Sequence, residues 1–373
     1  MALPACDILD LPGFVLPEAG PHLRDHVRPP ERRTAHYLER FDRTTLWYDL
    51  VRQETENRYL FTAPPFANLW PLLRDGLSRD GRPVQARLRR QAKYDQVVLP
   101  GPAGELTLDI GGTRHPLTVR PDIAQRFRGL NCAVTMNKDN PLDWIGDWAR
   151  YHVRRHRLEA VLIYDNGSTA YSPADLADVL CATQGLTRIV IARAPFPYGT
   201  TDKVEAGEVR PNYLQPAMLN LARSDLLRHA RAVLNCDVDE LVMCRDGSSV
   251  FDSAARSPFR AARLPVYWAE PGPGATGPAP QTAHRFRLAD QKRTPRKWCA
   301  VPGGWLSRIG GWHVHHIGGE IFKLIPEDRA HEVVHCRAAS TGWHPFKSRY
   351  RDNAESVEDP ELVAMMASLE ADR

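Results

Sequence analysis

The sequence has no long apolar run and little cysteine. None of its segments approaches the roughly 18 consecutive apolar residues that a membrane-spanning helix needs, which excludes such a helix. Its seven cysteines are scattered and odd in number, and the opening MALPACDILD contains neither a basic segment nor a long apolar run. These features predict a reduced, cytoplasmic protein rather than a secreted one. Association with a membrane surface through a partner or a surface helix stays open.

An excess of charge of either sign is also missing. The 49 lysine and arginine residues stand against 45 aspartate and glutamate residues, so the formal net charge is only +4. A balance this close to neutral provides no general attraction to nucleic acid or to anionic membranes, and we expect no nucleic-acid partner. Any site that binds an anion must therefore be local.

The first third of the chain has its own composition. Residues 1–90 are rich in proline and arginine, and apolar residues at helical spacing, as in ERRTAHYLERFDRTTLWYDLVRQE, predict mixed helical segments. From Tyr94 onward, short alternating runs separated by PGPAG and GGTR predict small antiparallel strands. We interpret residues 1–127 as an accessory region of α+β type, helical first and then β-rich.

From Leu130 onward, apolar strands alternate with amphipathic helices. Strands are predicted at LNCAVTM, AVLIYDNGST, LTRIVIARAP and VLNCDVDELVM, and helices at PLDWIGDWARYHVRRH, at SPADLADVLCATQG and over 213–230. Pro141 marks the start of the first helix, and Ser172 caps the second. This alternation predicts an α/β fold with a parallel sheet, and such sheets bind ligands at the carboxyl ends of their strands.

Three carboxylates stand close together in the fourth of these strands, VLNCDVDELVM. Because side chains alternate along a strand, Asp237 and Asp239 would point into one crevice and Glu240 away from it. Like charges at this spacing repel each other, so they need solvent or a cation. Mg²⁺ or Mn²⁺ bound here would bridge the oxygens of a nucleotide diphosphate. A solvated strand end is the alternative.

Three further segments carry polar side chains that suit such a site. In IYDNGST, Asp165 ends a strand before a tight turn, and in WHVHHIGG a strand would place His313 and His315 on one face. QKRTPRKW brings four basic residues into a loop that proline interrupts, where they would grip a diphosphate. The alternatives are a capped turn, a surface strand rich in histidine and a solvated loop.

Taken in order, these segments resemble the family-2-like glycosyltransferases and the related family 92 group, which share the GT-A fold. The resemblance extends from about Asn131 to Tyr350 and rests on VTMNKDNPLDWIGDWARYH, IYDNGST, RPNYLQPAMLNLA, NCDVDELV, LPVYWAEPGPGATG, RKWCAVP, GGWHVHH and HCRAASTGWHPFKSRY. It implies a Rossmann-like nucleotide-diphospho-sugar transferase domain over 128–352, with a mixed sheet flanked by helices. Residues 353–373 would form an acidic helical tail.

The resemblance also implies roles for individual residues. Asp237 and Asp239 match metal ligands of the family, and Asp237 also matches a contact to the nucleotide. His313 is the first choice for a third metal ligand, with His315 and His335 as alternatives. The remaining contacts to the nucleotide sugar would come from Lys138, Asp165, Trp268, Lys297 and Lys347.

The reaction implied is metal-dependent transfer of a sugar from a nucleotide-diphosphate sugar, with a UDP-sugar as the first choice, to an acceptor hydroxyl. The acceptor would be a glycan or cell-surface polysaccharide, and inversion at the anomeric carbon is expected. Mn²⁺ or Mg²⁺ would stabilise the departing diphosphate, and a carboxylate would take the acceptor proton. Glu270 is preferred for this over Glu240, while Trp268 is either an acceptor platform or core. A metal-dependent phosphoester hydrolase and a non-catalytic carbohydrate-binding or assembly protein remain alternatives.

Overall fold

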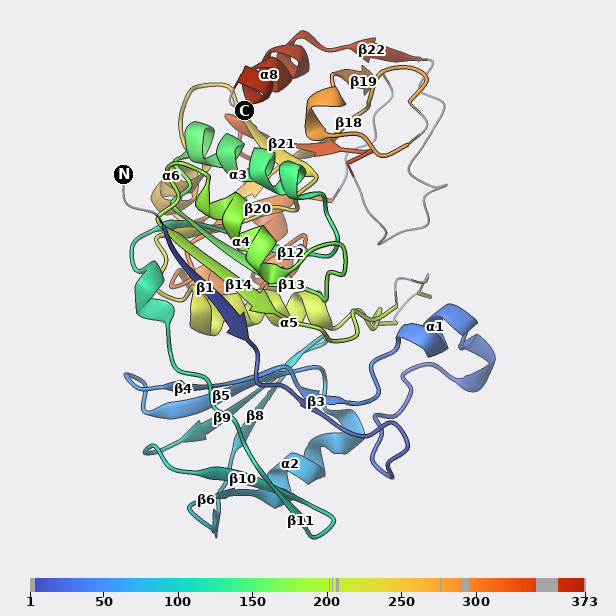
Figure 1. The fold of residues 1–373 in the computed structure, drawn as a ribbon, viewed down its shortest axis with the longest axis vertical. Coiled ribbons are helices and arrows are strands. Elements are labelled where there is room, and N and C mark those ends of the chain that lie inside the picture. The colour runs from blue at the N-terminus through green and yellow to red at the C-terminus, as the bar shows by residue number, and fades with distance from the viewer. Residues whose placement is uncertain are drawn as a thin grey trace. The chain divides into compact units, whose positions relative to one another are not determined.

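The chain forms two compact units, drawn together in Figure 1. The computed structural model describes residues 4–200, 202, 204–205, 208–275, 277–289, 295–339 and 355–371. The first unit consists of Met1–Leu9, Arg126–Arg193 and Leu227–Arg373, and the second of Asp10–Gln125 and Ala194–Leu226. Both segments of the second unit therefore interrupt the first unit in sequence.

A seven-stranded mixed sheet forms the centre of the first unit. In order across the sheet, its strands are β1 (Ala5–Asp10), β14 (Arg188–Arg193), β13 (Ala160–Asp165), β12 (Asn131–Asn137), β15 (Ala232–Asn235), β20 (Lys297–Ala300) and β17 (Ala261–Leu264). β14, β13, β12 and β15 run parallel, whereas β20 is antiparallel to its neighbours β15 and β17. The strands predicted at β12, β13 and β14 are confirmed, and β1 is an edge strand that the sequence pattern did not indicate.

The parallel strands end at one edge of this sheet. In the register, Asn137 at the end of β12 lies beside Asp165 at the end of β13, and Asp165 lies beside Arg193 at the end of β14. Asn235 ends β15 beside Val134 of β12. Open α/β sheets bind ligands at this edge, and the polar turns that follow β12, β13 and β15 lie there.

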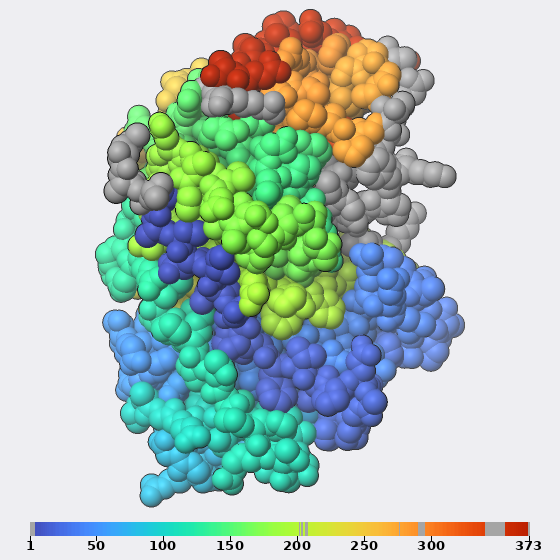
Figure 2. Space-filling model, viewed as in Figure 1, coloured from blue at the N-terminus to red at the C-terminus, as the bar shows by residue number. Residues whose placement is uncertain are grey.

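Two helices predicted from the sequence pack on this sheet, α3 (Leu142–His156) and α4 (Pro173–Cys181). Pro141 is the N-cap residue of α3, and Ser172 caps α4 in a reciprocal capping box with Asp175. The apolar faces of both helices join strand residues in a single buried cluster. In the space-filling view their residues, coloured green and yellow-green, form adjoining patches (Figure 2).

A second, three-stranded sheet lies in the same unit. Its order is β16 (Glu240–Cys244), β21 (His331–Cys336) and β18 (Val266–Ala269). β21 in the middle is antiparallel to β16 and parallel to β18. The remaining elements of the unit are α6 (Val250–Arg256), α7 (Trp305–Ile309), α8 (Pro360–Ala371), β19 (Phe286–Leu288) and β22 (Ser356–Glu358). The register sets His335 of β21 opposite both Glu240 and Trp268.

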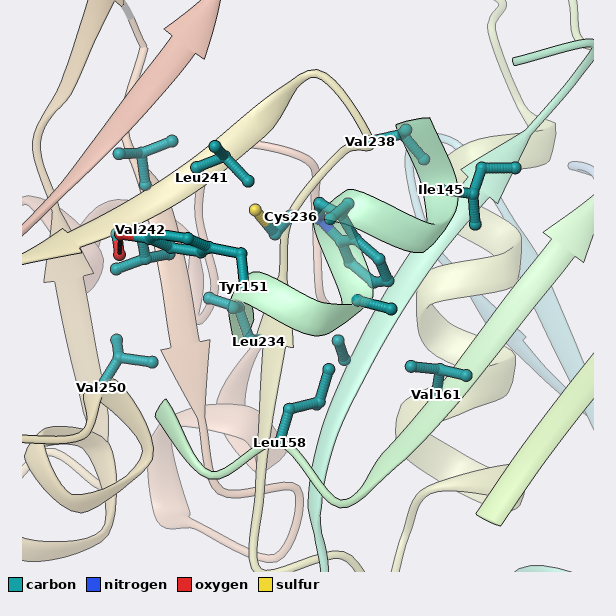
Figure 3. Packing of buried hydrophobic residues seen from close by; sticks show 14 of the residues in the cluster. Ile145, Tyr151, Leu158, Val161, Leu234, Cys236, Val238, Leu241, Val242 and Val250 are labelled. Atoms are coloured by element: carbon teal, nitrogen blue, oxygen red, sulfur yellow. Dashed lines mark hydrogen bonds between the residues drawn. The ribbon is translucent and has the colours of Figure 1, made fainter. Parts of the chain in front are cut away.

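The core of this unit joins α3 to both sheets. Figure 3 shows Tyr151 of α3 near Val242 of β16 and Leu234 of β15, and Ile145 of α3 on the side of Val238. The Tyr151 hydroxyl donates a hydrogen bond of 2.9 Å to the Val242 carbonyl oxygen. This contact ties the helix to the first residues after the turn that connects the two sheets.

The second unit is mainly β-sheet. One four-stranded sheet has the order β4 (Asp49–Gln53), β5 (Arg58–Ala63), β9 (Asp95–Pro100) and β8 (Arg87–Arg90), and another has the order β11 (Thr113–Pro116), β10 (Leu106–Ile110), β6 (Leu77–Arg79) and β7 (Arg82–Pro83). A short pair joins β2 (Phe14–Val15) to β3 (Thr45–Trp47), and the helices are α1 (Ala35–Arg40), α2 (Trp70–Gly76) and α5 (Leu214–Leu221). The antiparallel strands predicted after Tyr94 are confirmed. The helical interpretation of residues 31–54 is wrong beyond α1, because Thr45–Trp47 and Asp49–Gln53 form the buried strands β3 and β4.

A buried ion cluster holds distant segments of the second unit together. The Arg120 guanidinium donates to both carboxylate oxygens of Asp49, at 2.9 and 2.6 Å, and to Asp225 at 2.5 Å. Gln53 donates to the other oxygen of Asp225 at 2.9 Å. Each charged group is thus paired inside the unit, as burial of a charge requires.

The observed fold is a mixed α/β sheet flanked by helices, as predicted for the segment after residue 128. The residues that the structure describes include no helix that is both long and apolar enough to cross a membrane.

Candidate functional site

The carboxylate motif lies at a break between the two sheets of the first unit. The single strand predicted over Val233–Met243 is wrong: β15 ends at Asn235, and β16 begins at Glu240 in the other sheet. A turn connects them, closed by the hydrogen bond of 3.0 Å from the Glu240 amide to the Asp237 carbonyl oxygen. Because Asp237 lies in this turn and not in a strand, its side chain reaches solvent and is 31% exposed.

Lys297 lies between two of the three carboxylates. It is the first residue of β20, and the antiparallel register with β15 places it just beyond Asn235. Its ammonium is 2.5 Å from Oδ2 of Asp237 and 2.8 Å from Oε2 of Glu240. Glu240 therefore does not point away from Asp237, as strand alternation predicted, but shares a cation with it.

Burial controls the electrostatics of this cluster. Lys297 and Glu240 are each only 1% exposed. Burial acts to lower the pKa of Lys297, but attraction to Asp237 and Glu240 outweighs it and raises the pKa above its ordinary value. Burial raises the pKa of Glu240, and Lys297 opposes this shift. The Lys297 ammonium is therefore the charge on which the buried Glu240 carboxylate depends.

Asp239 has a different partner, His335. Its Oδ2 lies 3.1 Å from Nε2 of His335, while Nδ1 of the same ring is 3.5 Å from Oε1 of Glu240. The backbone carbonyl oxygen of Asp239 accepts a hydrogen bond of 2.8 Å from the Cys336 amide, which fixes the turn against β21. One imidazole thus contacts two carboxylates of the motif.

Trp268 connects His335 to a second charged pair, Arg337 and Glu270. The Trp268 ring lies against the His335 ring, with centroids 3.9 Å apart, and the Arg337 guanidinium carbon is 4.2 Å from the Trp268 centroid. Nε of Arg337 donates to Oε1 of Glu270 at 2.6 Å. Glu270 is fully buried, and its Oε2 has no hydrogen-bond partner among the residues that the structure describes. Arg337 thus connects the Glu270 carboxylate to the Trp268 ring.

Asp165 connects the turns after β12 and β13. Its Oδ1 accepts from the Asn137 amide at 2.9 Å and from the Ser168 hydroxyl at 2.5 Å, and its Oδ2 accepts from the Ser168 backbone amide at 3.1 Å. Asp139, in the left-handed region at φ +53°, binds the amides of residues 169 and 170. Lys138 beside it is exposed at the carboxyl edge of the sheet.

The histidine-rich segment forms a tight loop rather than the predicted strand. The bridge between Trp312 and Ile317 closes it, and the His313 amide donates to the His316 carbonyl oxygen at 2.9 Å. The His313 ring stacks on His316, with centroids 4.4 Å apart, so the strand-face pairing of His313 with His315 is wrong. His315 is exposed on this loop, and its Nδ1 lies 3.3 Å from the Arg296 carbonyl oxygen.

The structure brings most of the predicted residues of this cluster together. Asp237, Glu240 and Lys297 form one contact set, and Asp239 and Trp268 both meet His335. Asp237, Asp239 and His313 do not form a group whose donor atoms all lie within 4.8 Å; among the described residues, only one other trio does so. Lys347 lies outside the described residues.

Sequence reasoning gave too little weight to two residues, Asn137 and Arg337. Asn137 lies within the quoted NKDN segment, but no pattern marks it as the partner of Asp165. Arg337 follows His335 by two positions, so alternation along β21 would have placed both side chains on one face. That spacing was the available signal.

No family model and no curated protein matches this sequence. Solved structures that resemble it include the mannosyltransferase Ktr4p from S. cerevisiae, with 9% identity and a TM-score of 0.26 over 38% of this chain and 39% of that one. The galactosyltransferase LgtC with donor and acceptor sugar analogues has 13% identity and a TM-score of 0.32 over 64% and 95% of the two chains. The mannosyltransferase PcManGT from Pyrobaculum calidifontis, with GDP-Man and Mn²⁺, has 15% identity and a TM-score of 0.32 over 68% and 72%. The chain spans less than two thirds of the first two structures matched, 39% of Ktr4p and 58% of one LgtC structure.

Proposed function

We propose that this protein is a metal-dependent glycosyltransferase that moves a sugar from a nucleotide-diphosphate sugar, with a UDP-sugar as the first choice, to an acceptor hydroxyl on a glycan. The observation that carries the proposal is the turn between β15 and β16, where three carboxylates, Lys297 and His335 meet in one cluster. The turn lies at the ligand-binding edge of the sheet. The order of the sequence motifs supports the same conclusion.

The charges of the cluster fit a divalent cation. Three carboxylates against the single Lys297 ammonium leave two formal negative charges, to be balanced by His335 or by a bound ion. Asp237, Asp239 and His335 offer carboxylate oxygens and an imidazole nitrogen, a donor set that Mn²⁺ accepts. These three residues would hold the ion, with His335 in the place first proposed for His313. Their donor atoms do not all lie within 4.8 Å of one another, so the turn would have to rearrange when the ion binds. When bound, the ion supplies Lewis-acid stabilisation of a leaving diphosphate.

The groups of the chain itself would bind and orient the donor. Asp165 keeps the turns after β12 and β13 in register, and Lys138 on the first of these turns is exposed to meet a phosphate. Lys297 keeps Asp237 and Glu240 from repelling each other, so the motif stays folded before the donor arrives. Lys347 is proposed as a further diphosphate contact from the sequence motif alone.

On the acceptor side we assign the base to Glu270. Arg337 donates to Oε1 of Glu270. Oε2, for which the described residues provide no hydrogen-bond partner, would accept the proton of the acceptor hydroxyl. Trp268 would offer part of its ring to the apolar face of the acceptor sugar. Glu240 is the alternative base, but its contacts with Lys297 and the Asp237 amide give it a positioning role. Inversion at the anomeric carbon is part of the proposal.

The experiment that tests the proposal is a thermal-shift screen of nucleotide diphosphates and nucleotide sugars, with and without Mn²⁺. The native chain is compared with Asp239→Asn and with Asp178→Asn, an exposed aspartate on α4 outside the cluster. Ligands that bind only the folded state raise its stability, by about 2.7 kcal/mol at 100 times Kd. We expect a shift that needs one nucleotide plus Mn²⁺, is lost in Asp239→Asn and is kept in Asp178→Asn.

Ligands that pass this screen are then assayed for sugar transfer and nucleotide release with glycan acceptors. No shift at millimolar nucleotide in a folded protein would make the motif a solvated turn and the transferase proposal wrong. Cleavage of a phosphoester without any sugar acceptor would identify a hydrolase instead. Glycan binding that needs neither nucleotide nor metal would identify a binding protein.

A further inference from the structure

The far end of the ladder between β16 and β21 carries a second cluster of donor side chains. The register pairs Cys244 with His331 directly across these antiparallel strands, so both side chains leave the same face. Asp246 follows two residues after the end of β16, in the turn that leads to α6. The cluster lies four ladder positions from the pair of Glu240 and His335, a separation of about 13 Å at strand spacing.

The spacing of the donor atoms is that of a metal site. Sγ of Cys244, a carboxylate oxygen of Asp246 and a ring nitrogen of His331 all lie within 4.8 Å of one another. Sγ is 3.3 Å from Oδ1 of Asp246 and 3.0 Å from the carbonyl oxygen of Ser248. That oxygen is also 3.1 Å from Nε2 of His331. Ligands of a tetrahedral zinc ion with bonds of about 2.0 to 2.3 Å are roughly 3.5 Å apart, so only small movements are needed.

The other ring nitrogen of His331, Nδ1, contacts a carboxylate outside the cluster. Its Nδ1 is 3.1 Å from Oδ1 of Asp328, and the backbone amides of Ala330 and His331 fix that carboxylate at 2.9 and 3.1 Å. His331 is fully buried, and the His156 ring of α3 packs on it with centroids 5.6 Å apart. A carboxylate that orients the ring of a metal-binding histidine is typical of zinc sites. It leaves Nε2 directed at the cluster.

We propose that Cys244, Asp246 and His331, with the carbonyl oxygen of Ser248 or a water in the fourth position, form a structural site for Zn²⁺. On binding, the Sγ–H bond of Cys244 breaks, its proton goes to solvent and an Sγ–Zn bond forms. The thiolate and the Asp246 carboxylate then balance the charge of the ion. A thiolate favours Zn²⁺ over Mg²⁺ or Mn²⁺, which separates this site in chemistry and position from the Asp237 turn.

Such an ion would fix the register of the ladder that carries the active-site residues. It would link the end of β16 to the start of β21, and the same two strands present Glu240 and His335 at their other ends. A slip of one residue in this pairing would turn His335 away from Asp239. The site would thus be a structural cross-link between β16 and β21, outside the cluster around Asp237.

The test uses Co²⁺ as a spectroscopic probe on the full chain after treatment with a chelator. A bound Cys244 thiolate gives a sulfur-to-cobalt charge-transfer band, and we expect it to saturate at one equivalent and to disappear when Zn²⁺ is added. Cys244→Ser should abolish the band. Asp246→Asn should weaken Co²⁺ binding about tenfold or more. The matched control is Cys181→Ser, which changes another half-buried cysteine and should leave the band intact.

Two outcomes would overturn the proposal: no thiolate band in a folded native chain, or a band that Cys244→Ser leaves unchanged. Should Cys244→Ser fail to fold, Asp246→Asn decides, because its side chain is exposed and its loss leaves the core intact. Unchanged affinity in that variant would also contradict the site. Asp239→Asn should keep the band, since the Asp237 turn is separate.

Discussion

Replacing Lys297 by methionine should destabilise the first unit more than any surface charge does. The substitution keeps the length and apolar volume of the side chain but removes the ammonium between Asp237 and Glu240. Asp237 is 31% exposed and water would solvate it, whereas Glu240 is 1% exposed and would be left as a buried, unpaired carboxylate. The loss of folding free energy therefore comes mainly from the buried Glu240 carboxylate, which no longer has a cation beside it.

The magnitude follows from the remaining contacts of Glu240. Breaking a buried ion pair on one side costs about 3 to 5 kcal/mol. Glu240 keeps the Asp237 amide at 2.9 Å and His335 at 3.5 Å, which favours the lower end of this range. At about 2 °C per kcal/mol for a chain of this size, the melting temperature should fall by about 6 °C. In Lys297→Met/Glu240→Gln no charge is stranded, and about 2 °C should be lost.

Thermal denaturation followed by circular dichroism at pH 5 and pH 8 measures the melting temperatures of the single and the double variant. Glu240 has an ordinary pKa of 4.5, and the loss of Lys297 would raise its folded pKa further. The folded variant then binds a proton more readily than the unfolded chain, so its stability falls as pH rises above about 4.5. The deficit of Lys297→Met should thus be larger at pH 8 than at pH 5.

The control is Lys323→Met, which removes the exposed lysine paired with Glu320 at 2.6 Å and should leave the melting temperature unchanged. The reasoning is refuted if the melting temperature of Lys297→Met equals that of the native chain at pH 8. It is equally refuted if the double variant loses as much as the single one, because Glu240 would then not be the group that depends on Lys297.

Two further changes test the packing behind the site. Tyr151→Phe removes a buried hydroxyl that donates to Val242, and it should cost only about 1 kcal/mol because Nε2 of His156 still contacts that carbonyl oxygen at 2.7 Å. A loss above 3 kcal/mol in a denaturant titration would contradict this. Burial lowers the pKa of His152 to about 4 and that of His156 to about 3. Between pH 6.5 and 4, both rings are therefore protonated in the unfolded chain but largely neutral in the folded chain. Stability should therefore fall on acidification by up to about 1.4 kcal/mol per pH unit for each ring, and His152→Gln should give a shallower slope in melts over this range.

The sequence predicted the strands and helices between Asn131 and Arg193 well because periodicity and caps are local. The pattern of α3 and α4, with Pro141 and Ser172 at their starts, needs no knowledge of the rest of the chain. The apolar runs of β12 and β13 are buried on both faces, which makes them continuous and easy to recognise. The second unit gave weaker signals, since the apolar spacing of residues 31–54 fits a helix as well as the short strands that form.

The site was predictable in its residue types but not in its pairings. Asp237, Asp239 and Glu240 were recognised as a charge cluster, yet strand alternation gave the wrong direction for Glu240. Lys297, 57 positions later, was recognised only as a basic residue in a motif, because its ion pairs depend on β20 joining β15. The contact of Asp239 with His335 likewise needs β21 to pair with β16. Contacts between strands far apart in sequence carry no local signal.

The break in VLNCDVDELVM resolves the electrostatic difficulty that the motif poses. A continuous strand would hold Asp237 and Asp239 on one buried face, where each would raise the cost of ionising the other. By leaving the first sheet after Asn235 and entering the second at Glu240, the chain gives each carboxylate a separate environment. Asp237 keeps solvent and Lys297, Asp239 takes His335, and Glu240 alone is buried. Each carboxylate of the motif therefore has a partner of opposite charge or an imidazole within the chain.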